Sequence, residues 1–145
     1  METGETIKKG LLRLERYAQN IPGGFHCCAE DPENGYPFAY VSDRFLEILG
    51  WEREEFAARF DNRYTALIHP DDLAAGLRYR NAENSATYAK NGDSIFRILG
   101  KNGYRWVTNA ANQVEWYGKG YIVGTITDIT PYMELREKLE QQNRT

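Results

Sequence analysis

Five stretches of the chain have the character of β-strands: short apolar runs bounded by turn residues, with apolar and polar residues alternating most clearly around Arg97. Two stretches near the start, residues 25–29 and 37–42, flank a turn-forming cluster at 31–35, which favours a hairpin. Three more stretches fill the last third of the chain, separated by an Asn-Gly turn and a Tyr-Gly-Lys-Gly turn. These are residues 94–99, 104–115 and 121–129. The pattern therefore predicts two early strands and three late ones.

A helical period of three to four residues replaces the alternation between these two groups. Ser42 or Asp43 is expected to cap a first helix, which Gly50 ends. Further along, residues 52–60 form a second helical piece, residues 61–68 are irregular or briefly helical, and Pro70-Asp71-Asp72 opens a third helix that fades near residues 84–87.

Both ends of the chain carry amphipathic helical patterns. The N-terminal pattern is a heptad-like stripe of Ile7, Leu11, Leu14, Ala18 and Ile21, which Pro22-Gly23-Gly24 ends. The C-terminal helix is expected to start with Thr130, whose hydroxyl can cap a first-turn N–H, and Pro131 suits the first helical position. The apolar face of this helix consists of Ile129, Tyr132, Leu135 and Leu139.

The element order predicts an α+β fold with one five-stranded antiparallel sheet, short helices on one face, and helices at both ends. We expect residues 1–20 to form the N-terminal amphipathic helix, residues 21–130 the main domain, and residues 131–145 the C-terminal linker helix. A sheet covered by helices on one face leaves a cleft between the two layers, a common place for a small ligand.

Composition narrows the class of protein. The chain has 145 residues, 41% hydrophobic and 27% charged, which suits one soluble globular domain. A net charge of −3 offers no broad basic surface for nucleic acid or anionic lipid. No apolar run reaches the roughly 20 residues that span a bilayer, and the N-terminus lacks the apolar core of a signal peptide. With two cysteines only, this favours a cytoplasmic protein with reduced thiols.

Few residues match a catalytic or metal-binding pattern. Cys27 and Cys28 are neighbours in a predicted strand and point to opposite faces, so they do not readily share a metal ion or form an unstrained disulfide. Asp71 and Asp72 could act as an acid–base pair, but charge at a helix start explains them better. We expect no catalytic site and no metal. An enzyme acting through Cys27 or Cys28 is an alternative that replacing both by serine would test.

Four segments occur in an order that resembles the PAS domain family of bacterial signalling proteins. They are Tyr40–Phe45 with Leu49-Gly50-Trp51, then Ile68–Asp72, then Phe96–Val107, then Gly124–Thr130. The resemblance implies a sensory domain that binds a small molecule, cofactor or partner and passes a conformational change to an attached output domain. Histidine kinases, diguanylate cyclases and phosphodiesterases are common outputs in the family, and none of their signatures follows Thr130 here.

Strand alternation and the resemblance together indicate which side chains line the cleft. With Arg97 facing outward, period two and the family's strand arrangement give the cleft wall. The expected residues on the sheet are Phe96, Ile98, Val107, Asn109, Ala111, Ile122, Gly124 and Ile126. Those on the helices are Phe45, Leu49, Phe56, Tyr64, Ile68 and Leu77. Asn109 is polar on an apolar face, so it either contacts a ligand or bonds to backbone or water.

The cofactor-binding subgroups of the family are not matched. Some PAS domains hold haem through a histidine, but His69 stands in the family's ordinary His-Pro-Asp-Asp turn. Light-sensing relatives that bind flavin carry an Asn-Cys-Arg motif after the short helices, whereas residues 51–56 contain no cysteine. We therefore expect no haem and no flavin, and the identity of any small ligand is left open.

The expected signal junction is Asp128, Ile129 and Thr130, since related domains anchor this position through an aspartate. We expect a homodimer through the terminal helices, a covalently attached output domain, and no nucleic-acid or membrane partner. The dimer residues are Ile7, Leu11, Leu14, Leu135 and Leu139. Two alternatives stay open: the terminal helices fold back on the open face of their own sheet, or the domain only dimerises its parent and senses nothing.

Overall fold

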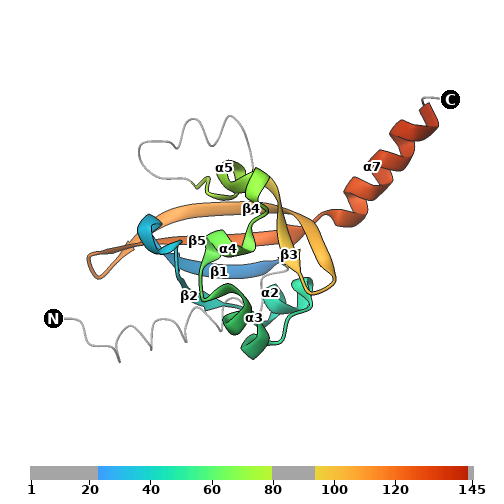
Figure 1. The fold of residues 1–145 in the computed structure, drawn as a ribbon. Coiled ribbons are helices and arrows are strands. Elements are labelled where there is room, and N and C mark those ends of the chain that lie inside the picture. The colour runs from blue at the N-terminus through green and yellow to red at the C-terminus, as the bar shows by residue number, and fades with distance from the viewer. Residues whose placement is uncertain (1–22, 80–93, 144–145) are drawn as a thin grey trace.

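The computed structural model describes residues 23–79 and 94–143. Its centre is a five-stranded antiparallel sheet with the strand order β2-β1-β5-β4-β3 (Figure 1). The strands are β1 (Gly24–Ala29), β2 (Phe38–Val41), β3 (Ser94–Gly100), β4 (Gly103–Trp116) and β5 (Lys119–Asp128). The first and last strands in sequence thus pair at the middle of the sheet. The α+β architecture predicted from the element order is confirmed.

Local turn chemistry explains the two late hairpins. Gly103, which follows Asn102, has a φ of 125°, and Tyr117 and Gly118 both have positive φ, at 53° and 77°. The two successive positive φ values of the second hairpin are those of a type I′ turn, which matches the right-handed twist of the flanking strands. β4 and β5 consequently stay paired as far as Trp116 and Lys119.

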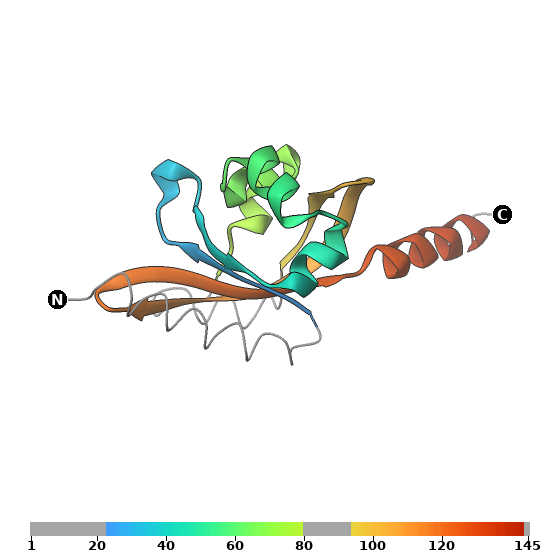
Figure 2. The ribbon, with the colours of Figure 1, turned by 90° about the horizontal axis from the view of Figure 1, so that it is seen from below.

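Short helical elements gather on one side of the sheet (Figure 2). They are η1 (Pro32–Asn34), α2 (Asp43–Leu49), α3 (Arg53–Phe60), α4 (Tyr64–Leu67), η2 (Pro70–Asp72) and α5 (Leu73–Gly76). Ser42 caps α2 through a hydrogen bond from the Phe45 N–H to its side chain, and Gly50 ends α2 in the left-handed region, as the sequence predicted.

The third predicted helix differs from expectation. Pro70 opens a 3-10 turn instead of a continuous helix, and the short α5 that follows ends at Gly76. The Tyr64 hydroxyl donates to the Gly76 carbonyl at 2.8 Å, so that oxygen is already engaged where a longer helix would use it. Residues 84–87, where the helix was expected to fade, lie outside the described residues.

The core lies between the sheet and the helical layer. Its most deeply buried large side chains include Phe45, Phe60, Leu67, Phe96 and Ile98. Rings from the helices and strands pack edge to face, as between Phe45 and Phe56, an arrangement that aromatic pairs favour.

The C-terminal helix α7 (Thr130–Asn143) extends away from this body instead of folding back on the sheet (Figures 1 and 2). Among the described residues, no helix combines the length and the apolar character needed to cross a bilayer. The predicted N-terminal helix at residues 1–20, with Ile7, Leu11 and Leu14, lies outside the described residues.

Candidate functional site

The side chains expected to line the cleft lie between the sheet and the helices. All eight expected sheet residues, from Phe96 to Ile126, are buried, and they share the face that meets the helical layer. Of the six expected helix residues, Leu77 is partly buried and the others are buried. These residues therefore share one buried face, and their role in binding a ligand stays a prediction.

One small cavity lies within this region. Its volume is about 10 Å³, close to the minimum for one water molecule and far below the roughly 300–1,000 Å³ of ligand pockets. Five expected residues line it: Tyr64, Leu77, Asn109, Ala111 and Ile122. The other nine expected residues, led by Phe45 and Phe96, are not part of its lining. Residues that were not expected also line it: His26, Cys28, Tyr36, Gly76, Arg78 and Tyr79.

A buried hydrogen bond links His26 and Asn109 across the sheet. His26 Nε2 lies 3.1 Å from Asn109 Oδ1, so the tautomer with its proton on Nε2 donates to the amide oxygen. Gly124 of β5 lies between them: a Cβ there would be 2.7 Å from both atoms. A side chain at position 124 would therefore break the contact.

His26 is held as a neutral imidazole. Burial lowers the pKa of His26 from 6.5 to about 4, although the hydrogen bond with Asn109 opposes this shift. Its ring stacks on Tyr64, with centroids 5.3 Å apart. His26 is not among the residues that the sequence analysis expected to line the cleft. The signal that could have found it is its pairing with Gly124, which requires knowing that β1 and β5 are neighbours.

The two cysteines are buried and lie in different surroundings. Cys27 pairs with Val123 and Cys28 with Ile122, so their side chains point to opposite faces of the sheet, as predicted. Cys28 lines the cavity, with its Sγ 3.8 Å from His26 Nδ1. Burial raises the pKa of Cys27 to about 11 and also raises the pKa of Cys28, so neither thiol is activated. Across residues 23–79 and 94–143, no group of three or more His, Cys, Asp or Glu side chains could hold a metal ion.

The predicted signal junction is a set of contacts between the end of β5, the start of α7, and β4. Asp128 Oδ1 accepts a hydrogen bond from the Thr130 N–H at 2.9 Å, and Asp128 Oδ2 accepts two from the Arg105 guanidinium. Burial alone would raise the pKa of Asp128, but the hydrogen bonds from Thr130 and Arg105 outweigh it and hold that pKa below its usual value.

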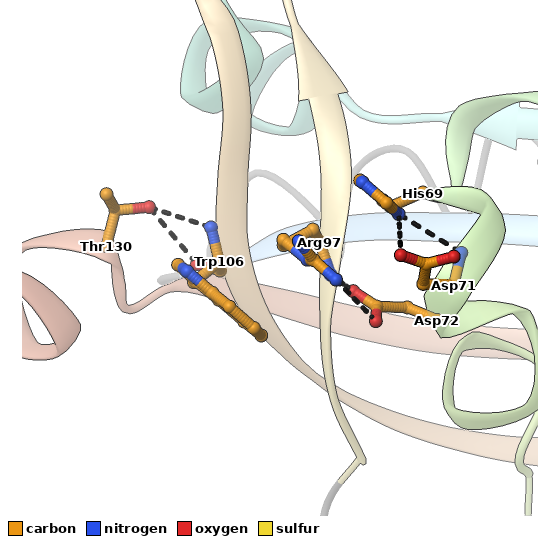
Figure 3. A network of polar contacts seen from close by, with 6 residues as sticks. All are labelled: His69, Asp71, Asp72, Arg97, Trp106 and Thr130. Atoms are coloured by element: carbon orange, nitrogen blue, oxygen red, sulfur yellow. Dashed lines mark hydrogen bonds and ion pairs between the residues drawn. The ribbon is translucent and has the colours of Figure 1, made fainter.

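Thr130 acts differently from the expectation that its hydroxyl caps a first-turn N–H. The hydroxyl oxygen instead accepts the Trp106 N–H of β4 at 2.8 Å (Figure 3), and the Ile129 N–H donates to the Trp106 carbonyl at 2.8 Å. The Thr130 hydroxyl lies close to β4 because β5, which ends just before Thr130, is paired with β4 there. The first turn of α7 is thus fastened to the backbone of β4.

A polar network continues from this junction to the helical layer (Figure 3). The guanidinium carbon of Arg97 on β3 lies 4.9 Å from the centre of the Trp106 ring. Arg97 Nε and Nη2 donate to the two oxygens of Asp72 at 2.8 and 3.0 Å, and these bonds lower the pKa of Asp72. Asp72 belongs to η2, so a chain of contacts joins the turn beside the cavity to the start of α7.

His69 and Asp71 have structural roles at the same turn. His69 Nδ1 accepts the Asp71 N–H at 3.1 Å, and its ring lies 4.7 Å from that of Tyr104. Because Asp72 is ion-paired with Arg97 while Asp71 points to solvent beside His69, the two aspartates do not form the acid–base pair considered from the sequence.

Beyond its first turn, α7 is exposed. Tyr132, Leu135 and Leu139 are 61%, 56% and 51% exposed, and they form the apolar stripe expected from the sequence. An open groove of about 510 Å³ lies between the opposite side of the helix and β4. Its lining residues are Tyr104, Trp106, Thr130, Met133, Glu134, Arg136, Glu137 and Glu140.

Comparisons with known proteins agree with this geometry. A family model described as PAS fold matches residues 38–126. The chain is similar to a sensory box histidine kinase/response regulator from Burkholderia thailandensis E264, with 25% identity and a TM-score of 0.55, covering 92% of this chain and 99% of that one. It is also similar to a PAS domain from a two-component sensor histidine kinase, with 13% identity and a TM-score of 0.57, covering 83% of this chain and 97% of that one.

A third similar structure is an RNA-binding light-oxygen-voltage receptor, with 17% identity and a TM-score of 0.61. The match covers 100% of this chain and 40% of the receptor, so the chain spans less than half of the receptor's length. At this identity the likeness concerns the fold alone. No curated protein matches the chain in sequence.

Proposed function

The chain belongs to the PAS fold family, and on that premise we propose that it is a sensory module regulating an output domain in the same polypeptide. It binds a small ligand or a partner in the cleft between sheet and helices and transmits a conformational change through α7. The output is of the histidine kinase or diguanylate cyclase type, so catalysis belongs to the parent protein and not to this domain.

The observation that carries this proposal is the way α7 is held. Its first turn is fastened to β4 through Thr130 and Ile129, and the Asp128 carboxylate joins the same point to Arg105. The rest of the helix extends into solvent. A few hydrogen bonds at one end therefore set the direction of the whole helix, which suits a two-state switch in which a small local shift redirects a long element.

The network in Figure 3 supplies a route from the cleft to this switch. Gly76, the last residue of α5, and Leu77, which follows it, line the cavity, and α5 follows directly on η2. Asp72 of η2 holds Arg97, and Arg97 packs on Trp106, to which Thr130 is bonded. A molecule that shifts residues 72–77 would thereby disturb the start of α7, because these groups are in direct contact.

Similarity supports the kinase type of output over the cyclase type. The relative with 25% identity is a sensory box histidine kinase/response regulator, and it is covered over 99% of its chain. The cyclase alternative rests on the general family resemblance. In either case we infer a cytoplasmic domain with no nucleic-acid partner, which the net charge of −3 supports.

We infer that the module works as a homodimer through its terminal helices. An isolated helix as short as α7 is marginal in water, yet Leu135 and Leu139 expose about half of their surface. Pairing with the same stripe of a second copy in a short parallel coiled coil would bury them. The N-terminal stripe that contains Leu11 would add to the same interface.

We also propose that the cleft holds neither haem nor flavin. His69 already accepts a backbone hydrogen bond through Nδ1 and packs on Tyr104, so it is not directed at the cavity. A cavity of about 10 Å³ would have to expand many times over for a flavin to enter.

The same small cavity favours a second candidate function, a purely structural dimerisation module without a ligand. Two experiments together distinguish the sensory function from the purely structural one. The first is mass spectrometry of molecules that copurify with the protein, and the second is a fusion of the chain to a histidine kinase core. The sensory proposal expects a stoichiometric small molecule whose removal changes autophosphorylation. An empty dimer whose fused kinase ignores substitutions in the cleft would establish the structural role instead.

A further inference from the structure

A row of uncharged polar side chains crosses the otherwise apolar inner face of the sheet. It consists of Ser94 on β3, Asn109 on β4 and His26 on β1, and we call it the polar row. In the β-ladder, Ser94 is opposite Asn109, and His26 is opposite Gly124 of β5. Because Gly124 has no side chain, the Asn109 side chain passes over it and contacts His26. The hairpin of β3 and β4 and the distant strand β1 thus place hydrogen-bonding groups on one face of the sheet.

The polar row is buried and not fully satisfied. Its three side chains are each 1% exposed. Within residues 23–79 and 94–143, Ser94 Oγ has no hydrogen-bond partner. An unpaired hydroxyl removed from water is costly, and Ser94, although outside the cavity lining, lies beside Asn109, which is part of that lining, so a ligand that enlarges the cavity can pair with it. The amide of Asn109 can both donate and accept, and His26 offers a second ring nitrogen beside Cys28.

Charge narrows the kind of molecule that fits. No member of the polar row is ionised at neutral pH, because burial keeps His26 neutral. A charged ligand placed there would lose its hydration without gaining an opposite charge. The charged residue in the cavity lining is Arg78, which is only partly buried, as are its neighbours Leu77 and Tyr79. Together with Tyr36, they are the partly buried members of the lining, and a ligand would have to displace side chains of this set to make room.

We propose that the cleft binds an uncharged molecule that presents a hydrogen-bond donor and an acceptor along one edge, as a primary amide or a nitrogen heterocycle does, to the polar row. The inference rests on the proposed sensory function and names the chemistry of its ligand. Ser94 pairs with the ligand's donor or acceptor, and Asn109 exchanges part of its bonding with His26 for bonding with the ligand.

The test uses acetamide and acetate, which have the same shape and nearly the same size but differ in charge and in donor capacity. Each is titrated at pH 7 and equal ionic strength into the ¹⁵N-labelled full chain, and nuclear magnetic resonance follows the His26 ring N–H and the Asn109 side-chain amide. Acetamide is expected to shift both signals in a saturable way, with acetate at least about tenfold weaker.

Two variants and a matched control locate the site. Ser94→Ala and Asn109→Leu are each expected to weaken acetamide binding by about fivefold, which is the typical effect of one hydrogen bond. Thr108→Val changes the residue next to Asn109 on the opposite face of β4 and is expected to leave binding unchanged. Backbone amide spectra show whether each variant is folded; Ser94→Ala removes only the unpaired hydroxyl and keeps the test valid if Asn109→Leu does not fold.

Three results would overturn the inference. They are equal or tighter binding of acetate with shifts at Arg78, acetamide binding that neither variant changes, and no saturable binding of acetamide. The sensory proposal has separate tests. A copurifying ligand that proves to be charged would refute the chemistry proposed here while leaving the sensory function intact.

Discussion

Arg105 and Asp128 form a two-point contact where the sheet meets the C-terminal helix. Arg105 Nε and Nη2 both donate to Asp128 Oδ2, at 3.0 and 2.9 Å, while the other carboxylate oxygen accepts the Thr130 N–H at 2.9 Å. One carboxylate therefore ties β4, β5 and α7 together, in the place where the family resemblance put an anchoring aspartate.

Asp128→Ala is expected to weaken coupling to the output more than it weakens ligand binding, because Asp128 contacts α7 and not the cavity. In the kinase fusion, the variant should lose most of the difference in autophosphorylation between ligand-loaded and ligand-free protein. Asp43→Ala, which removes an exposed partner of Arg53, serves as the control. An equal loss of affinity and coupling would contradict the assigned role of Asp128.

Arg97→Lys is expected to loosen the start of α7 although it keeps the positive charge. Lysine lacks the planar fork that bonds both oxygens of Asp72 and stacks less well on Trp106. Hydrogen exchange of the first-turn amides of α7 should become faster. A double-mutant cycle built from Arg97→Lys and Thr130→Val should give an interaction energy above about 0.5 kcal/mol. Arg44→Lys, at an exposed pair with Glu47, is the control, and strict additivity would mean that the network does not couple the two sites.

Gly124→Ala is expected to destabilise the fold by about 1–3 kcal/mol, the usual cost of an extra methyl group in a packed core. The new Cβ would lie 2.7 Å from His26 Nε2 and from Asn109 Oδ1 and would separate them. Gly120→Ala on the same strand is the matched control, because its nearest neighbour is the movable end of the Glu30 side chain. Urea denaturation measures both, and equal midpoints would show that the cleft has room at position 124.

Acid is expected to destabilise the protein between pH 6.5 and about 4 through His26. The folded-state pKa of His26 is lowered to about 4, so in this range the unfolded chain binds more protons than the folded chain. Stability therefore falls as the pH falls, by about 3 kcal/mol in total for a shift of this size.

Asp72 and Asp128, whose pKa values are lowered, lose their contribution only at more acidic pH. Thermal unfolding across the pH range should show that His26→Phe flattens the slope between pH 6.5 and 4. A slope unchanged in His26→Phe would assign the acid sensitivity to other groups.

Leu135→Glu together with Leu139→Glu is expected to turn a dimer into a monomer, because both leucines lie on the exposed stripe of α7. Light scattering over a range of concentrations gives the molar mass directly. Glu137→Lys, on the side of the same helix opposite the stripe, should leave the dimer intact. A native protein that stays monomeric at high concentration would contradict the dimer.

Local patterns in the sequence were sufficient for the elements of the fold. Apolar runs between turn signals identified all five strands, and alternation together with the family's strand arrangement identified the inward side chains from Phe96 to Ile126. Capping chemistry located α2 between Ser42 and Gly50 because the signals and the structure they specify lie within a few residues.

Contacts between distant segments were decided only by the tertiary structure. Asn109 was singled out from the sequence, but its partner His26 lies 83 residues away, and nothing local indicates that β1 and β4 flank Gly124 of β5. The Tyr64 hydroxyl bonds the Gly76 carbonyl where α5 ends, and the Trp106 N–H bonds the Thr130 hydroxyl, which the local pattern assigned to the first turn of α7. Periodicity fixes the face on which a side chain lies, whereas its partner depends on which strands become neighbours and on how tightly the core closes around them.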